Sequence, residues 1–107
     1  MKDEFLEHLL ATIKTKKSEN PEKSYTAKLQ QSDISETLKK IEEEALEVID
    51  AVKLKNKSNI VHEVADLWFH CLVLLAKKNL TVDDITNELK NRQGISGIEE
   101  KLNRVKK

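Results

Sequence analysis

The chain has 107 residues, of which 38% are hydrophobic and 36% are charged, and its 19 basic residues balance its 19 acidic residues. This length fits one domain, residues 1–107, and the zero net charge disfavours a nucleic-acid or membrane-surface binder. The presence of only two glycines and one proline argues against loop-rich sandwiches, barrels and Rossmann-type folds, so we expect an all-α protein.

The N-terminal part of the chain is predicted to form one helix and one short helical segment. The first helix carries an apolar stripe at helical spacing: Phe5, Leu6, Leu9, Leu10 and Ile13. A polar stretch over residues 16–24, which contains Pro21, ends this helix. A segment of one or two helical turns is expected over residues 25–30.

The second long helix is predicted to begin after Asp33, because Glu36 three residues later completes the spacing of a capping box. Apolar residues hold one face of this helix up to about Leu54. A turn is expected over residues 56–59, with Ser58 as the N-cap of the next helix.

The third long helix, over about residues 60–77, is apolar around most of its circumference and includes Trp68. Such a helix is normally buried. In a domain this small the other helices cannot easily surround it, so we expect it at a subunit interface, most simply that of a homodimer.

The spacing of Thr81 and Asp84 predicts the cap of a fourth helix, and Gly94 and Gly97 mark a break before a basic tail. We expect the tail from about residue 93 to be mobile. The predicted architecture is therefore an antiparallel bundle of about four helices, completed by homodimerisation.

Three further features favour a cytoplasmic protein. Acidic residues interrupt the first eight positions, so no signal peptide is predicted. No apolar run approaches the roughly 20 residues of a membrane span. The single cysteine, Cys71, lies in an apolar stretch and is expected to be a buried free thiol.

Acidic residues are concentrated on the second long helix, where residues 36–50 hold six acids and two lysines. Glu44 and Glu47 are three residues apart there, and Glu63 and Asp66 repeat this spacing on the following helix. On consecutive antiparallel helices the two pairs could face each other. Four carboxylates form an all-oxygen site that suits Mg²⁺ or Mn²⁺ rather than zinc.

The alternative interpretation is a set of salt bridges between these acids and lysines from elsewhere in the chain. On the third long helix, Lys77 and Lys78 lie two turns or more beyond His70, so we expect no local i, i+4 cationic partner for Glu63 and Asp66. Spacing alone favours neither interpretation. His70 lies on the same polar strip, and we expect it to form hydrogen bonds behind the site or in the core rather than to bind a cation.

Several stretches of the sequence resemble the all-α nucleoside triphosphate pyrophosphohydrolases, the MazG-like superfamily, and within it the phosphoribosyl-ATP pyrophosphohydrolases of histidine biosynthesis. The acids of Glu43–Glu47 and Glu63–Asp66 match the superfamily signature, EExxE…ExxD. The stretches over residues 24–29 and 96–101 point to the histidine branch. Glu42 departs from the pattern, which commonly has glycine there.

The resemblance implies an enzyme that hydrolyses phosphoribosyl-ATP to phosphoribosyl-AMP and pyrophosphate with Mg²⁺, for which Mn²⁺ is a plausible substitute. It implies that the acids at four positions bind the metal: Glu44, Glu47, Glu63 and Asp66. Glu43 and Glu47 are the expected catalytic carboxylates, with Glu43 orienting water or binding a second ion. The residues expected to contact substrate phosphates are Lys28, Lys40, Arg92 and Lys101.

Two other functions remain open at this stage. A MazG-type housekeeping pyrophosphatase acting on ordinary or damaged nucleoside triphosphates would have the same metal site. A non-enzymatic helical dimerisation module would use the acids only to pair with lysines. Whether the chain is a standalone enzyme or a piece of a fusion with the next enzyme, the cyclohydrolase, is also open.

Overall fold

The structure, a computed structural model, describes residues 4–93, and all regular elements in this range are helical. Its elements are α1 (Glu4–Thr15), the 3₁₀ turn η1 (Lys16–Ser18), α2 (Tyr25–Gln31), α3 (Ile34–Lys53), α4 (Lys57–Lys77) and α5 (Val82–Gln93). The prediction of an all-α protein is confirmed. The predicted break at Gly94, the tail and Lys101 lie outside the described residues.

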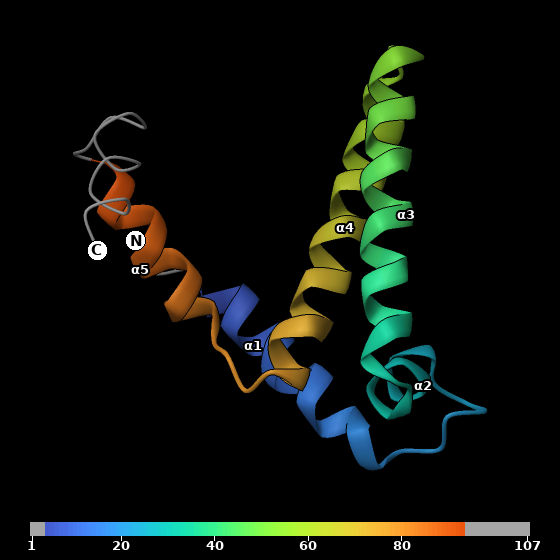
Figure 1. Ribbon diagram of the computed structural model, residues 1–107, viewed down its shortest axis with the longest axis vertical. Coiled ribbons are helices and arrows are strands. Elements are labelled where there is room, and N and C mark those ends of the chain that lie inside the picture. Colours follow the sequence, from blue (N-terminus) through green and yellow to red (C-terminus); the bar gives the residue numbers. More distant parts are fainter. Residues whose placement is uncertain (1–3, 94–107) are drawn as a thin grey trace.

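Helices α3 and α4 form an antiparallel hairpin that makes one arm of the molecule (Figure 1). The turn between them places Lys55 in the left-handed region, with φ of 58°. Asn56 then caps α4 by accepting a hydrogen bond from the Asn59 backbone N–H at 3.1 Å. The prediction of Ser58 as the cap is wrong. Ser58 lies in the first turn of α4, and its hydroxyl donates to the Asn56 side chain.

Side-chain caps also set the starts of the other helices after α1. The Asp33 carboxylate accepts from the backbone N–H of Ser35 and thereby caps α3, so the cap is formed through Ser35 rather than through the predicted box with Glu36. The predicted capping box before α5 is confirmed. The Thr81 backbone N–H donates to Asp84 at 2.8 Å and the Asp84 N–H donates to the Thr81 hydroxyl at 3.1 Å.

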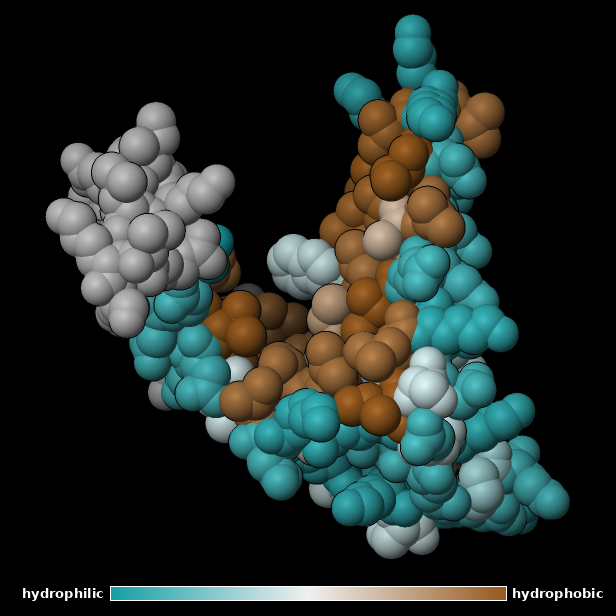
Figure 2. Space-filling view, viewed as in Figure 1, coloured by the Kyte–Doolittle hydropathy of each residue, from teal (hydrophilic) through white to brown (hydrophobic). Residues whose placement is uncertain are grey.

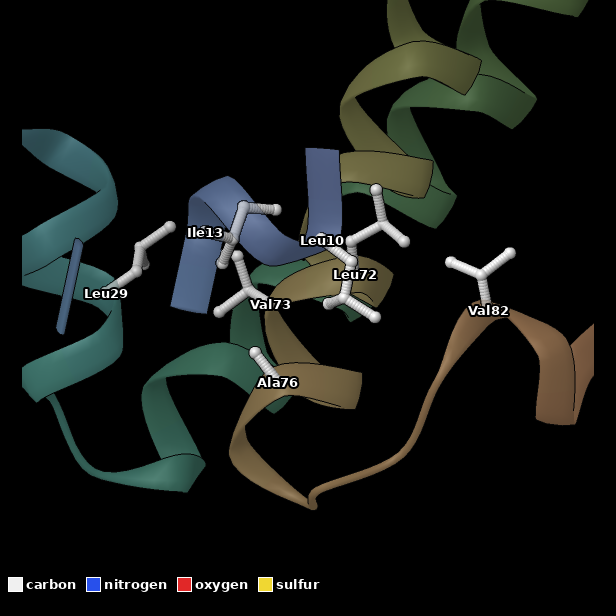
Figure 3. Close-up of a cluster of buried hydrophobic side chains, with 7 residues drawn as sticks. All are labelled: Leu10, Ile13, Leu29, Leu72, Val73, Ala76 and Val82. Atoms are coloured by element: carbon white, nitrogen blue, oxygen red, sulfur yellow. The ribbon is translucent and has the colours of Figure 1, made fainter. Parts of the chain in front are cut away.

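The hydrophobic core lies at the base of the hairpin, where α1 and α2 meet the C-terminal half of α4 (Figure 3). Its buried members come from four helices: Leu10, Ile13, Leu29, Leu72, Val73, Ala76 and Val82. The acidic half of the hairpin extends beyond this core, so the core fixes the base of the arm and leaves its upper faces uncovered.

Over residues 4–93, one chain does not close into a four-helix bundle. Helix α5 packs on α1 and forms a second arm away from the hairpin, so the molecule is V-shaped (Figure 1). The radius of gyration is 16.2 Å, against about 13 Å for a compact chain of this length. Hydrophobic side chains line the inner side of the V (Figure 2). The predicted bundle is therefore not confirmed for the single chain.

Helix α4 is less covered than its apolar composition predicted. Val61 is 70% exposed and Trp68 is 57% exposed. The prediction that Cys71 is buried is wrong for the single chain, because it is exposed on the part of α4 that no other described helix covers. Neighbouring side chains still partly desolvate the sulfur, which raises the pKa of this thiol.

Helix α4 also bears on the prediction that no segment could cross a membrane. It has 21 residues and contains an 18-residue stretch with a mean hydropathy of 1.3, so it is long and apolar enough to do so by length and composition alone. The central helix of a small soluble protein passes the same test. Glu63 and Asp66 lie in the middle of α4, where carboxylates are costly in hydrocarbon.

Candidate metal centre

Three carboxylates meet across the α3–α4 hairpin. Glu44 and Glu47 are one turn apart on α3, and Glu63 lies opposite them on α4. Each offers one oxygen to a group in which all ligand atoms lie within 4.8 Å of one another. Asp66 is not in this group but in an adjacent one, with Glu63 and His62, that meets the same distance criterion. Glu63 is thus shared between the two groups.

Two carboxylate oxygens in this cluster are buried and unpaired. Glu44 is 9% exposed, and within the described part of the chain neither its Oε2 atom nor Oε2 of Glu63 has a hydrogen-bond partner. Leaving a buried polar atom unsatisfied costs about 1–3 kcal/mol, and more when the group is charged. An arrangement that retains this cost fits a ligand set for a hard cation, because a bound divalent cation would satisfy both oxygens.

Hydrogen bonding, desolvation and charge repulsion within the cluster shift the pKa values of its carboxyl groups. A side-chain hydrogen bond with Glu47, followed by desolvation, raises the pKa of Glu63 from 4.5 to about 7. Desolvation and the nearby Glu47 charge raise the pKa of Glu44. The pKa of Glu47 is lowered, chiefly by its hydrogen bond with Glu63. Without a cation, the Glu47–Glu63 pair therefore holds a proton near neutral pH.

His62 is a neighbour of the cluster that the sequence analysis missed. Its Nε2 lies 3.4 Å from Oδ2 of Asp66, four residues along α4, and 3.8 Å from Oε1 of Glu63. The expectation of no local i, i+4 cationic partner for these acids is therefore wrong whenever His62 is protonated. The signal in the sequence is the i, i+4 spacing of His62 and Asp66, because a histidine at that spacing can pair with the acid as a lysine or arginine does.

The described residues predicted to contact the substrate phosphates lie on three different helices. Lys40 is on α3 one turn before Glu44, and its Nζ pairs with Oε2 of Glu43 at 3.4 Å. Lys28 is exposed on α2. Arg92 is on α5, in the other arm, where it pairs with Glu88 at 3.2 Å. The structure thus brings Lys40 and Glu43 to the edge of the cluster and does not bring Arg92 there.

His70 is buried one turn beyond Asp66, with 5% of its surface exposed. Its Nδ1 lies 2.8 Å from the Asp66 carbonyl oxygen and its Nε2 lies 3.0 Å from the Tyr25 hydroxyl. Both ring nitrogens are therefore occupied by protein partners. In this geometry His70 links α2 to the turn of α4 that carries Asp66.

Comparison with known proteins identifies the family. The model of the phosphoribosyl-ATP pyrophosphohydrolase family matches residues 6–93. The chain belongs to this family. The resemblance stated from the sequence is thereby confirmed, together with the prediction that the chain is a pyrophosphohydrolase. The matched range contains both acid groups and Tyr25, Lys28, Lys40 and His70.

Relatives in the phosphoribosyl-ATP pyrophosphohydrolase family align over nearly their full length. The phosphoribosyl-ATP pyrophosphatase of Nitrosomonas eutropha is 50% identical over 99 residues, which cover 92% of this chain and 85% of the relative. That of Hydrogenovibrio crunogenus is 46% identical over 110 residues, covering 99% and 97%. That of Neisseria meningitidis serogroup B is 47% identical over 105 residues, covering 98% of each chain.

Proposed function

We propose that this protein hydrolyses phosphoribosyl-ATP between its α- and β-phosphates, releasing phosphoribosyl-AMP and pyrophosphate, as the second step of histidine biosynthesis. The family match and relatives named phosphoribosyl-ATP pyrophosphatase at 46–50% identity support this substrate. The observation that carries the mechanism is the pair of buried, unpaired oxygens on Glu44 and Glu63, in a cluster of three carboxylates.

The cation that fits this cluster is Mg²⁺, with Mn²⁺ as a substitute. Glu44, Glu47 and Glu63 would hold it, and Asp66 would contribute through the adjacent group that shares Glu63. All four donors are carboxylates, which hard divalent cations prefer. When bound, such a cation supplies positive charge to the phosphate oxygens and makes water more acidic.

The remaining residues of the site have separate roles in this proposal. Glu47 is 3 residues from Glu44 on the same helix face and can accept a proton from the attacking water as well as bind the cation. Glu43 orients that water from the cluster edge. Lys40 and Lys28 offer positive charge to the phosphates. Arg92 lies on α5, in the other arm, so we do not include it among the residues that contact the phosphates.

A substrate panel with product identification tests the proposal. Purified protein is incubated with phosphoribosyl-ATP, ATP or deoxynucleoside triphosphates, each with Mg²⁺ or with a chelator. We expect phosphoribosyl-AMP and pyrophosphate from the first substrate, only with the cation, and no orthophosphate. A preference for the ordinary triphosphates would instead support a MazG-type housekeeping enzyme. No hydrolysis and no saturable Mg²⁺ binding would support the dimerisation module.

We further propose that the active form is a cytoplasmic homodimer in which the hairpins of two chains form one four-helix bundle. Helices α3 and α4 of the hairpin carry six large hydrophobic residues that are each at least 49% exposed: Leu38, Leu46, Ile49, Val52, Val61 and Trp68. Leu38, Ile49 and Val52 lie within about 60° of one another around α3, and Val61 and Trp68 share one face of α4. A soluble monomer rarely exposes this much apolar surface on one arm.

A further inference from the structure

The hydrogen bonds of His70 determine which of its nitrogens carries the proton. Nδ1 faces the Asp66 carbonyl at 2.8 Å, and a carbonyl oxygen can only accept. Nδ1 therefore donates, which leaves Nε2 of the neutral ring as an acceptor. The Tyr25 hydroxyl, 3.0 Å from Nε2, is then the donor. The link between α2 and α4 is thus directional: Tyr25 donates to His70, and His70 donates to the main chain at Asp66.

The hydroxyl end of this link borders the proposed metal centre. The pKa of Tyr25 is raised chiefly by desolvation, and its charge interactions are with Lys40, Glu44, Asp66 and Glu43. Glu44 belongs to the cluster and Asp66 to the adjacent group, and Glu43 and Lys40 pair at the edge. The Tyr25 hydroxyl is thus hydrogen-bonded to the buried imidazole of His70 and interacts electrostatically with charged groups of the site.

Helix α2 depends on such contacts for its position. It has seven residues, and an isolated helix of that length is not stable in water. Its buried residues Ala27, Leu29 and Gln30 pack one side of it against the base of the hairpin. Tyr25, in the first turn, adds a directed hydrogen bond at the end near the acids. Lys28 follows one turn later, about 60° away around the helix.

We propose that Tyr25 is a positioning residue: its hydrogen bond to His70 fixes the first turn of α2 against α4 and thereby holds Lys28 where it meets the phosphates of the substrate. The inference rests on the proposed function, since it assigns Lys28 a substrate phosphate. It does not make Tyr25 or His70 a ligand of the cation. The expected effect of losing the hydroxyl is therefore on substrate binding rather than on cation binding.

The test is a double-mutant cycle between Tyr25→Phe and Lys28→Ala. Each single variant is expected to raise KM for phosphoribosyl-ATP about tenfold, with Mn²⁺ affinity in the absence of substrate within twofold of wild type. If Tyr25 acts through Lys28, Tyr25→Phe has little further effect on KM in the Lys28→Ala background. An unchanged KM in Tyr25→Phe overturns the inference, and so does a full additive effect in the double variant.

Two controls separate positioning from a general loss of stability. Ile13→Val removes one methylene from the core on α1, lowers stability, and should leave KM unchanged. Nitrogen-15 NMR of the imidazole in the wild-type protein should show the Nδ1–H tautomer for His70, and the Nε2–H tautomer would overturn the inference without any variant. If the wild-type protein fails to hydrolyse phosphoribosyl-ATP, the proposed function fails. If the wild-type protein is active and Tyr25→Phe leaves KM unchanged, only this inference fails.

Discussion

Glu47 and Glu63, on consecutive antiparallel helices, share a side-chain hydrogen bond that only a protonated carboxyl group can donate. This bond is the largest cause of the raised pKa of Glu63, about 7, and of the lowered pKa of Glu47. The two groups titrate as a pair, and the proton on Glu63 is lost only as the pH rises through about 7. A cation bound there would take the place of that proton.

The first prediction is that the cation-free protein loses stability as the pH rises towards neutral. The pKa of Glu63 is about 7 in the folded protein and 4.5 ordinarily, so the folded state binds more protons between these values. The contribution of Glu63 to the stability of the folded protein is fully present below about pH 4.5 and is lost as the pH rises through about 7. The lowered pKa of Glu47 acts in the opposite direction, and only below its ordinary value. Thermal unfolding with a chelator present should show Tm falling across this range.

Added Mg²⁺ should reverse that loss, because the cation stabilises the ionised pair. We expect saturating Mg²⁺ to raise Tm more at about pH 8 than at about pH 5, where it must displace protons. Glu63→Gln is the matched control, since it keeps the size of the side chain and removes the titration. An equal Mg²⁺ shift at both pH values in the wild type would contradict a cation site at this pair.

The second prediction concerns Glu47→Gln, which keeps the side-chain size and removes one negative charge. Because Glu47 is proposed both to bind the cation and to accept a proton, turnover should fall at least about 100-fold. The circular dichroism spectrum should be unchanged, since Glu47 is exposed and outside the core. Glu88→Gln, a similar change on α5 away from the cluster, should keep wild-type turnover. Unfolding of Glu47→Gln would indicate instead that the acid is structural.

The long helices and their caps follow local rules, so much of this fold could be predicted from the sequence. Capping by Asp33 and by the Thr81–Asp84 box depends on residues within three positions of one another. The start of α4 differs from the prediction, because the side chains of both Asn56 and Ser58 can cap a helix. The turn geometry, with Lys55 in the left-handed region, selects Asn56.

The acid cluster was predictable in outline because the i, i+3 spacing places each pair on one helix face. What spacing could not give is the register between α3 and α4. That register brings Glu63 to Glu44 and Glu47 and leaves Asp66 beside His62. The Tyr25–His70 bond joins residues 45 positions apart, and no local pattern indicates it. The exposure of Cys71 was missed because helix composition does not say which face another helix covers.

The third prediction separates Lys40 from its neighbour in sequence. Lys40 lies at the edge of the cluster, paired with Glu43 at 3.4 Å, whereas Lys39 is exposed one position away. Lys40→Ala should raise KM for phosphoribosyl-ATP about tenfold, which corresponds to about 1.4 kcal/mol of binding free energy. Lys39→Ala should change KM by less than twofold. Equal effects of the two substitutions in steady-state kinetics would mean that Lys40 contributes only general positive charge.

The last prediction concerns the oligomeric state. If hairpins pair through their apolar faces, light scattering should give twice the chain mass of 12.3 kDa, and Trp68→Glu should give a monomer because it would bury an unpaired charge in the interface. Leu89→Glu on α5 is the matched control, since Leu89 is 58% exposed and Trp68 is 57% exposed. A dimer that survives Trp68→Glu but not Leu89→Glu would place the interface on the α1–α5 arm. A wild-type monomer would refute dimerisation altogether.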